Sequence, residues 1–327
     1  MTWLKNKIYW LLFSRTPTGE VLSIIYSMHL HLRYSFSDRS PGTDREKLKY
    51  YLAKHCHIVE KGLALPAPRP AFGQPKIIDL IEKTRDYEIL FGKDDITKVV
   101  RDTIREYISF HDDKKVTLPN EFLDTLSKFV SEAFPQEKGG LKKLEKKMWG
   151  EFSLKSYEKF VSHRHSVRNF SNAPVDDEVI IKSISTSLNT PSVCNRQGWM
   201  IHYYNNKLAI RNLLSYQNGN SGFMESIDKL LIITGNTKAF TRYEHNQQFV
   251  DGGLLSMNLM LALHSAGLGS CPLNTCMPFY KEEKLKKAAK IPNHEKLIMM
   301  IAVGNLKDSF SVAQSEKYQI EQVLRVH

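Results

Sequence analysis

The chain has 327 residues, of which 42% are hydrophobic and 25% charged, values typical of a globular protein with one large or two medium-sized domains. Lys and Arg outnumber Asp and Glu by 46 to 35, a net charge of +11 that raises nucleic acid, anionic lipid and phosphorylated ligands as partners. Residues 1–150 carry 26 Lys and Arg against 20 Asp and Glu, and residues 151–327 carry 20 against 15. Because this excess is spread and not gathered in a basic arm, we predict no nucleic-acid partner.

The N-terminal thirty residues are apolar and aromatic but contain no run of about 18 apolar residues that could cross a membrane. Two short apolar runs, Ile8–Phe13 and Val21–Leu32, are separated by Arg15, Pro17 and Gly19. With basic residues at its flanks, this segment could lie on an anionic membrane surface, or it could pack on its own protein or on a partner subunit. The absence of a prompt signal-peptide cleavage site and of C-x-x-C spacing favours a reducing cytoplasm, with peripheral membrane contact left open.

The first half of the chain has a helical pattern. Asp44 is suited to cap a helix that ends near Gly62, since glycine is common just past a helix end. A polar, Lys-rich stretch at 136–147 with two glycines reads as a linker. We therefore predict a helical N-terminal extension at 1–150 and a second domain at 151–327. Three further helices are expected in the extension: Pro75–Leu90, Asp95–Phe110 and Asn120–Ala133.

The second half mixes strands and helices, which favours an α+β or α/β domain in which helices cover a sheet. The expected strands are Trp199–Tyr204, Lys229–Thr234 and Lys296–Val303. The expected helices are Asp176–Leu188, Leu208–Tyr216, Gln247–Ser265 and Lys281–Ala289.

One group of metal-ligand residue types lies in the first half: His55, Cys56, His57 and Glu60. On a helix His55 and His57 point about 200° apart, so they cannot share one metal, whereas His57 and Glu60 lie on the same face. We favour a buried or capping role for these residues and predict no metal site.

Three segments of the second half carry side chains suited to a polar ligand. The run from His163 to Arg168 has two arginines and a hydroxyl, which suit a phosphate or the polar edge of a heteroaromatic ring, although alone it could be a solvated basic turn. The loop Pro191–Trp199 is dense in hydrogen-bonding groups. A long apolar helix contains Asp251-Gly252-Gly253 and is expected to end at Gly267–Ser270. Glycines inside a helix lower its stability, so we expect close helix packing or the approach of a ligand to compensate for the two glycines.

In this order the motifs R-H-S-V-R-x-F, P-S-x-x-N-x-Q-x-W, D-G-G and G-L-G-S, over about residues 155–327, resemble the nitroreductase family of FMN-dependent oxidoreductases. The resemblance implies an α+β fold with a central, antiparallel-rich sheet flanked by helices, preceded here by a mainly helical domain. C-N-R-Q, Q-x-G-N-x-G-F, C-x-L-N and H-x-V-E-K-G-L are similar to a subgroup found with bacterial polysaccharide biosynthesis clusters.

The resemblance also implies which residues bind FMN. Arg164 is assigned mainly to the phosphate and Arg168 to the pyrimidine edge or ribityl chain, because a phosphate dianion needs cations. The Pro-Ser backbone of the second motif is expected to reach the flavin of the other subunit, with a looser loop at Gly198, where the family usually has proline. Lys317 stands where the family has Arg, and could also be a solvated tail residue. The full set is Arg164, His165, Ser166, Arg168, Pro191, Ser192, Asn195, Gln197, Gly269, Ser270, Leu273, Asn274 and Lys317.

The activity that the resemblance implies is a ping-pong reaction. NADH or NADPH delivers hydride to flavin N5 and leaves, and an unidentified small-molecule acceptor is then reduced. No catalytic acid or base is named, and Tyr216, Gln217, Asn220 and Phe223 are candidate substrate contacts. A homodimer with FMN at the interface is implied. The alternatives are a flavin-dependent dehydrogenase or oxidase of a biosynthetic intermediate, and a redox-inactive flavin-binding accessory protein recruited through the N-terminal domain.

Overall fold

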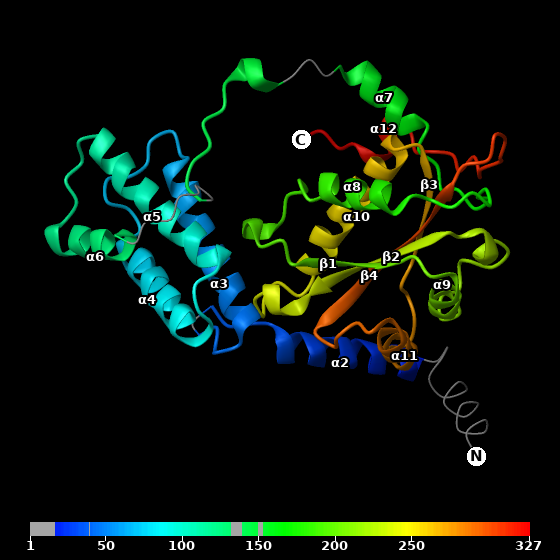
Figure 1. Ribbon diagram of the computed structural model, residues 1–327, viewed down its shortest axis with the longest axis horizontal. Coiled ribbons are helices and arrows are strands. Elements are labelled where there is room, and N and C mark those ends of the chain that lie inside the picture. The colour runs from blue at the N-terminus through cyan, green and yellow to red at the C-terminus, as the bar shows by residue number, and fades with distance from the viewer. Residues whose placement is uncertain (1–16, 39, 132–138, 150–152) are drawn as a thin grey trace.

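The computed structural model describes residues 17–38, 40–131, 139–149 and 153–327 (Figure 1). The apolar run Ile8–Phe13 and residues 136–138 of the expected linker lie outside the described residues. The N-terminal helices are α2 (Pro17–Tyr34), α3 (Arg45–Leu63), α4 (Gln74–Phe91), α5 (Asp95–Asp113) and α6 (Asn120–Val130). The later helices are α7 (Leu154–Ser162), α8 (Asp177–Ser187), α9 (Lys207–Leu214), α10 (Gln247–Ser265), α11 (Phe279–Ala289) and α12 (Ile320–Val323), with short 3-10 turns η1 (Lys146–Trp149), η2 (Val193–Asn195), η3 (Met224–Ser226) and η4 (Thr237–Ala239).

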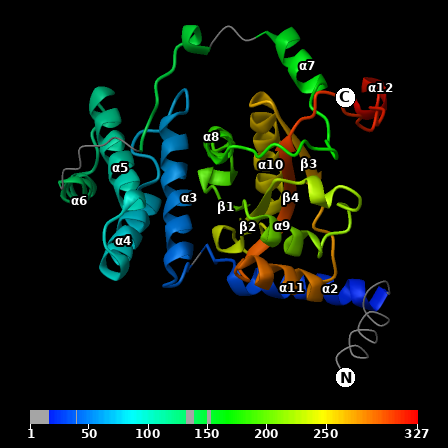
Figure 2. The ribbon, with the colours of Figure 1, turned by 45° about the vertical axis from the view of Figure 1, so that its right-hand side comes forward.

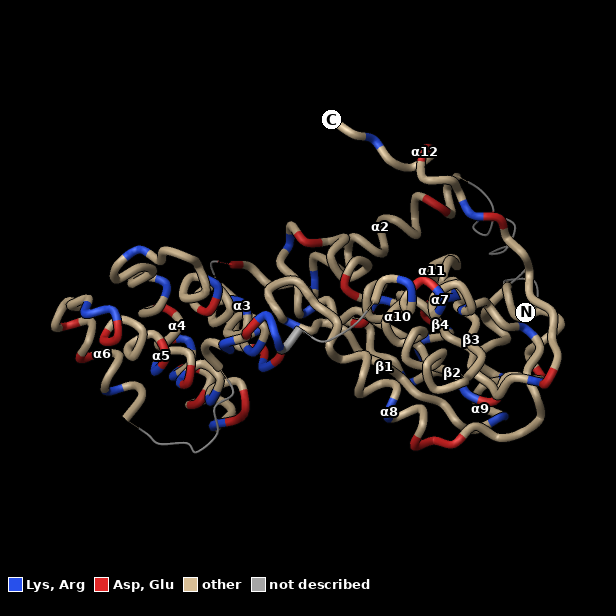
Figure 3. Tube along the Cα trace, turned by 90° about the horizontal axis from the view of Figure 1, so that it is seen from above, with Lys and Arg blue, Asp and Glu red and all other residues tan. Residues whose placement is uncertain are grey.

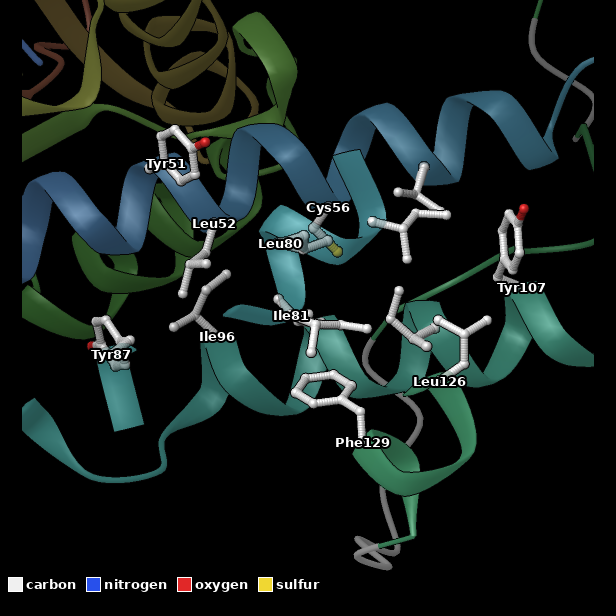
Figure 4. Close-up of a cluster of buried hydrophobic side chains, with 14 of the residues drawn as sticks. Tyr51, Leu52, Cys56, Leu80, Ile81, Tyr87, Ile96, Tyr107, Leu126 and Phe129 are labelled. Carbon is white, nitrogen blue, oxygen red and sulfur yellow. The ribbon is translucent and has the colours of Figure 1, made fainter. Parts of the chain in front are cut away.

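Helices α3 to α6 enclose a hydrophobic core of their own (Figure 4). Asp44 caps α3 as expected, accepting hydrogen bonds from the backbone N–H groups of Glu46 and Lys47 at 3.1 Å. Inside the bundle the buried Arg101 guanidinium pairs with Glu88, one of its two hydrogen bonds being 2.8 Å long. The four helices therefore have an apolar core of their own and an ion pair buried inside the bundle.

The second core lies around a four-stranded sheet whose order is β1-β2-β4-β3 and whose strand pairs are all antiparallel. The strands are β1 (Trp199–Tyr204), β2 (Lys229–Asn236), β3 (Leu268–Leu273) and β4 (Glu295–Asn305). Helices α8 and α10 pack together and α10 contacts all four strands, while α9 and α11 contact each other (Figure 2). The two central strands are fully buried along most of their length, as their continuous apolar sequence predicts.

The overall α+β pattern is as expected, but strand β3 and helices α2 and α7 differ from the sequence prediction. Residues 268–270, expected as the end of the long helix, and residues 271–273, for which no element was expected, together form strand β3 at one edge of the sheet. Gly269, Ser270 and Pro272 have low strand propensity, but an edge strand tolerates proline because one side of its backbone needs no partner. Helices α2 and α7 were also not expected, because Pro17 and Gly19 read as breaks and α7 has only nine residues.

Polar contacts join α3 to the sheet region. Lys238 of η4 donates to Asp44 at 2.9 Å and to Glu46 at 2.8 Å, and the Asn236 side chain donates to Glu46 at 2.9 Å. Figure 3 shows charges of both signs over the helices of both regions, which agrees with the similar excess of basic residues in the two halves of the sequence. The predicted boundary near residue 150 stays a prediction.

Candidate functional site

The segment that follows α7 is fixed to the sheet by its apolar residues. The Val167 N–H donates to the Ser270 carbonyl at 3.0 Å, and Val167 and Phe170 are buried. A Cβ built on Gly304 would come within 2.6 Å of the Phe170 ring, so a glycine is needed in β4 for this ring to pack. Because alternate residues of an extended segment point in opposite directions, this anchoring leaves the Arg168 side chain exposed.

A pocket of about 480 Å³ brings this segment together with the C-terminal tail. Arg164 and Arg168 of this segment and Lys317 of the tail all line it, so three cations share one pocket. Among the described residues none of the three makes an ion pair, and the only carboxylate that lines the pocket is Glu316. Uncompensated cations around a pocket suit a dianionic group such as a phosphate. His165 and Ser166 line the same pocket.

Strand β3 lies beside this segment and holds the next predicted residues. Ser270 forms a parallel bridge with Ser166 and is buried. A Cβ on Gly269 would come within 2.8 Å of Leu306 and 3.1 Å of Phe170, so close packing explains this glycine. Burial raises the pKa of the neighbouring Cys271 thiol, and the Arg168 charge offsets part of this rise. Leu273 is buried in the core and Asn274 is exposed just after the strand.

The loop at 191–198 is held from beneath by a buried ion pair. The Arg196 side chain is fully buried, and its guanidinium donates to both Glu244 oxygens at 2.8 and 2.7 Å and to the Ala239 carbonyl at 2.7 Å. Burial raises the pKa of Glu244, but hydrogen bonds from Arg196 and Thr241 outweigh it and lower the pKa to about 2. Glu244 therefore stays ionised, and the pair fixes the loop to η4 and the segment after it.

The tip of this loop presents amides to solvent on a strained backbone. Cys194, Asn195 and Gln197 all have φ near +50°, a region that non-glycine residues rarely adopt and that is frequent at binding sites. The Val193 N–H donates to the Asp251 carboxylate at 3.2 Å, and the Gln197 N–H donates to the Ser192 hydroxyl at 2.8 Å. Asn195 and Gln197 are left exposed, as is Pro191.

Gly198, which we expected to loosen the loop, is closely packed against Ala239 and Phe240. A Cβ there would come within 2.6 Å of the Ala239 Cβ and 3.0 Å of the Phe240 ring. That expectation is therefore wrong: glycine allows the loop to pack more closely. The two glycines of α10 differ in the same way, because a Cβ on Gly252 would meet Ile298 at 2.9 Å while one on Gly253 would have no atom within 4 Å.

The predicted flavin-binding residues thus fall into two sets that one chain does not bring together. In the first set, Arg164, His165, Ser166, Arg168 and Lys317 line one pocket, which we call the phosphate pocket, and Gly269 and Ser270 lie in the adjoining strand β3. Leu273 and Asn274, at and just after the end of β3, do not line this pocket. The second, the amide loop 191–197, leads into β1. Because β1 and β3 are the two edges of the sheet, three strand spacings of about 4.8 Å separate them. Figures 1 and 2 show these strands on opposite sides of β2 and β4.

The four candidate substrate contacts have mainly structural surroundings. The Gln217 amide donates to the Asn274 carbonyl at 3.2 Å, and the Asn220 amide donates to the Leu214 and Gln217 carbonyls at 2.8 and 2.9 Å. Phe223 is buried in the core, where Tyr216 packs in part. These side chains therefore shape the turn beside Asn274.

The His-Cys-His group of α3 also makes internal contacts. The Cys56 thiol donates to the Thr103 hydroxyl at 3.1 Å, His55 stacks on Tyr51 with ring centroids 3.9 Å apart, and His57 pairs with Glu60 at 3.3 Å. Burial raises the pKa of Cys56 to about 12. In the described part of the chain no cluster of three or more His, Cys, Asp or Glu is suited to hold a metal.

Sequence reasoning gave no role to the residues that support the amide loop. Arg196 was part of a motif, but nothing in its neighbours revealed that it is buried and paired with Glu244, 48 residues away. Asp251 was noted only as part of D-G-G, and its contact with the Val193 N–H spans 58 residues. A buried ion pair between distant residues leaves no local signal in one sequence.

Comparison with known proteins relates this geometry to one family. Residues 161–218 and 207–305 match the family model described as the nitroreductase family. Similar solved structures include an FMN-dependent nitroreductase from Clostridium difficile, with 18% identity, a TM-score of 0.45 and coverage of 51% of this chain and 98% of that one. A nitroreductase-like protein from Streptococcus mutans has 18% identity, a TM-score of 0.46 and coverage of 54% and 100%. A nitroreductase with bound FMN from Desulfitobacterium hafniense has 18% identity, a TM-score of 0.42 and coverage of 52% and 97%.

Residues 161–305 therefore match the nitroreductase family model, and the described residues have the α+β fold that the motifs predicted. The matched range includes residues 164–168 of the phosphate pocket and the amide loop. Lys317 lies after it, and helices α2 to α7 lie before it or at its start. The family assignment supports a flavin-dependent oxidoreductase in general terms.

Proposed function

We propose that this protein is an FMN-dependent NAD(P)H oxidoreductase that reduces an unidentified small-molecule acceptor by a ping-pong mechanism. The observation that carries the proposal is the phosphate pocket, in which Arg164, Arg168 and Lys317 surround about 480 Å³ with no ion pair to a described residue. The donors fit FMN, because Arg164 and Lys317 match the charge of its terminal phosphate and Arg168 suits the ribityl chain or the polar edge of the ring. The same domain belongs to a family whose members include FMN-binding proteins.

Each set of residues has its own task in this proposal. The phosphate pocket binds the charged end of FMN, and Arg168, close to β3, stabilises negative charge on the flavin ring. The amide loop offers donors and acceptors to the ring from a backbone that Arg196 and Asp251 hold rigid. When bound, FMN accepts hydride from NAD(P)H and passes electrons to the acceptor. The residues named here orient the reactants, and none is assigned as a general acid or base.

We further propose that the complete site is built by a homodimer. The two sets lie at opposite edges of the sheet, and a second copy of the chain would bring the amide loop of one chain to the phosphate pocket of the other. Helix α10 exposes a stripe of apolar side chains that a second copy could cover. These are Phe249, Val250, Leu254 and Met257, and the C-terminal tail adds exposed Tyr318, Ile320, Val323, Leu324 and Val326. A cytoplasmic location and the link to polysaccharide biosynthesis stay predictions.

The direct test of this function is the visible spectrum of the full-length protein, before and after anaerobic addition of NADH or NADPH. We expect a flavin spectrum, release of FMN on denaturation, and bleaching by at least one of the two nicotinamides. Flavin that binds but is not bleached would contradict the reductive half-reaction and favour the dehydrogenase or oxidase alternative. A protein that takes up no FMN even in excess cofactor would contradict the function as a whole.

A further inference from the structure

Helix α2 presents an apolar face to solvent. Val21, Ile24, Ile25, Met28 and Leu32 are each more than half exposed, with Ile24 the most exposed at 64%. At 3.6 residues per turn these five positions fall within an arc of about 100° that contains no charged residue. Exposed aliphatic residues are usually scattered, so five on one continuous face indicate a surface that another body covers.

The opposite face of α2 already packs on the protein and fixes the orientation of the helix. The Tyr26 ring contacts the Phe279 ring of α11 with centroids 5.3 Å apart. His31 is buried and its Nε2 lies 3.1 Å from the Arg242 carbonyl, while the Ser23 hydroxyl accepts from the Phe279 N–H at 3.4 Å. The apolar face therefore cannot turn inward without breaking these contacts, and no described residue buries it.

The charge around this face is positive. Helix α2 itself exposes Arg33, one residue after Leu32. Helix α11, which contacts α2, exposes Lys284 and Lys287. Glu20 and Glu283 are the exposed carboxylates of the two helices, so cations predominate in this region. An apolar face with basic flanks is the pattern of helices that bind anionic lipid surfaces.

We propose that α2 docks this protein on an anionic membrane surface, with its five exposed aliphatic side chains in the interfacial layer and the basic residues against lipid head groups. At about 1.5 Å per residue the helix is about 27 Å long, and it would lie flat on the surface. None of the helices in the described ranges is long and apolar enough to cross a bilayer, which agrees with a helix that lies on the membrane. The charge excess favours lipid over a second copy of the chain, because two copies of a basic region repel each other.

The test is co-sedimentation of the full-length protein with vesicles of phosphatidylcholine alone or with about 30% phosphatidylglycerol. We expect binding to the anionic vesicles only, weakened by about 0.5 M NaCl because salt screens the charges. The variant Ile24→Gln/Met28→Gln should bind about tenfold more weakly, since two side chains lose their apolar contact with lipid. The control Ile89→Gln/Leu208→Gln changes aliphatic residues that are 82% and 74% exposed on α4 and α9 and should bind as the unchanged protein does.

Several outcomes would overturn the proposal. They are absence of binding to anionic vesicles, equal binding to neutral vesicles, or equal weakening by the control variant. If Ile24→Gln/Met28→Gln instead dissociated an oligomer in light scattering and left vesicle binding unchanged, the face would belong to a second copy. A circular dichroism melt confirms that each variant is folded, and Leu32→Gln provides a second variant of the same face. All of these proteins should contain the same amount of flavin. A failure of membrane binding can therefore be told apart from a failure of the proposed flavin-dependent function.

Discussion

The double variant Arg164→Ala/Arg168→Ala is expected to lose FMN during purification while staying folded. Hydrogen bonds to charged groups contribute about 1.5–3 kcal/mol each, so removing two should weaken FMN binding at least about 100-fold. Neither arginine makes an ion pair with a described residue, and Arg168 is exposed, so the fold does not depend on them. The measurement is the FMN-to-protein ratio from the spectrum, followed by titration of the apoprotein with FMN.

The matched control for that experiment is Arg211→Ala. Arg211 lies on α9, is more than half exposed, and pairs with Glu225; neither residue lines the phosphate pocket. It removes one positive charge without touching the predicted site, so its FMN ratio should equal that of the unchanged protein. A double variant that retained one FMN per chain would refute the assignment of Arg164 and Arg168 to FMN binding.

The second large effect is expected on stability, from Arg196→Ala. Breaking a buried ion pair by removing one partner costs about 3–5 kcal/mol, because the other charge is left without compensation. Here Glu244 would lose both bonds from the guanidinium, and the Ala239 carbonyl would lose its donor. For a domain of this size the melting temperature should fall by roughly 5–15 °C. The amide loop should loosen with it, so FMN binding should also weaken.

Thermal unfolding of Arg196→Ala is best compared with Arg211→Ala, because both variants remove an arginine paired with a glutamate. The Arg211–Glu225 pair is exposed on both sides, and exposed pairs contribute about 0–1 kcal/mol. A near-unchanged melting temperature is therefore expected for the control. If the two variants melted alike, the buried pair would not be what holds the loop.

Much of the fold was predictable from the sequence because hydrophobic periodicity and capping residues are local signals. The helix capped by Asp44 and the strand Trp199–Tyr204 have the predicted starts, and the antiparallel sheet agrees with the family resemblance. Strand β3 was missed because its sequence, LGSCPL, has poor strand propensity and is held by pairing with β4, more than 25 residues later. Tertiary pairing here outweighs local preference.

The candidate site was predictable only in part for the same reason. The motifs identified Arg164, Arg168 and Asn195, and the structure brings the two arginines to one pocket with Lys317, about 150 residues away. That Asn195 lies at the other edge of the sheet, and that Arg196 beside it is buried, follows from topology that no motif encodes. The exposed face of α2 was likewise hidden, because the sequence does not show which side of an apolar helix packs.

The FMN content of a mixed dimer shows directly whether one flavin site is shared between two chains. One chain carries Arg164→Ala/Arg168→Ala, and the other carries Asn195→Asp/Gln197→Glu, which keeps the side-chain shapes and repels an anionic ligand. If each site combines the phosphate pocket of one chain with the amide loop of the other, the mixed dimer has one site with all four changes and one intact site. We then expect one FMN per mixed dimer, although each variant alone binds almost none. A mixed dimer without flavin would mean that both sets act within one chain, contradicting the shared site.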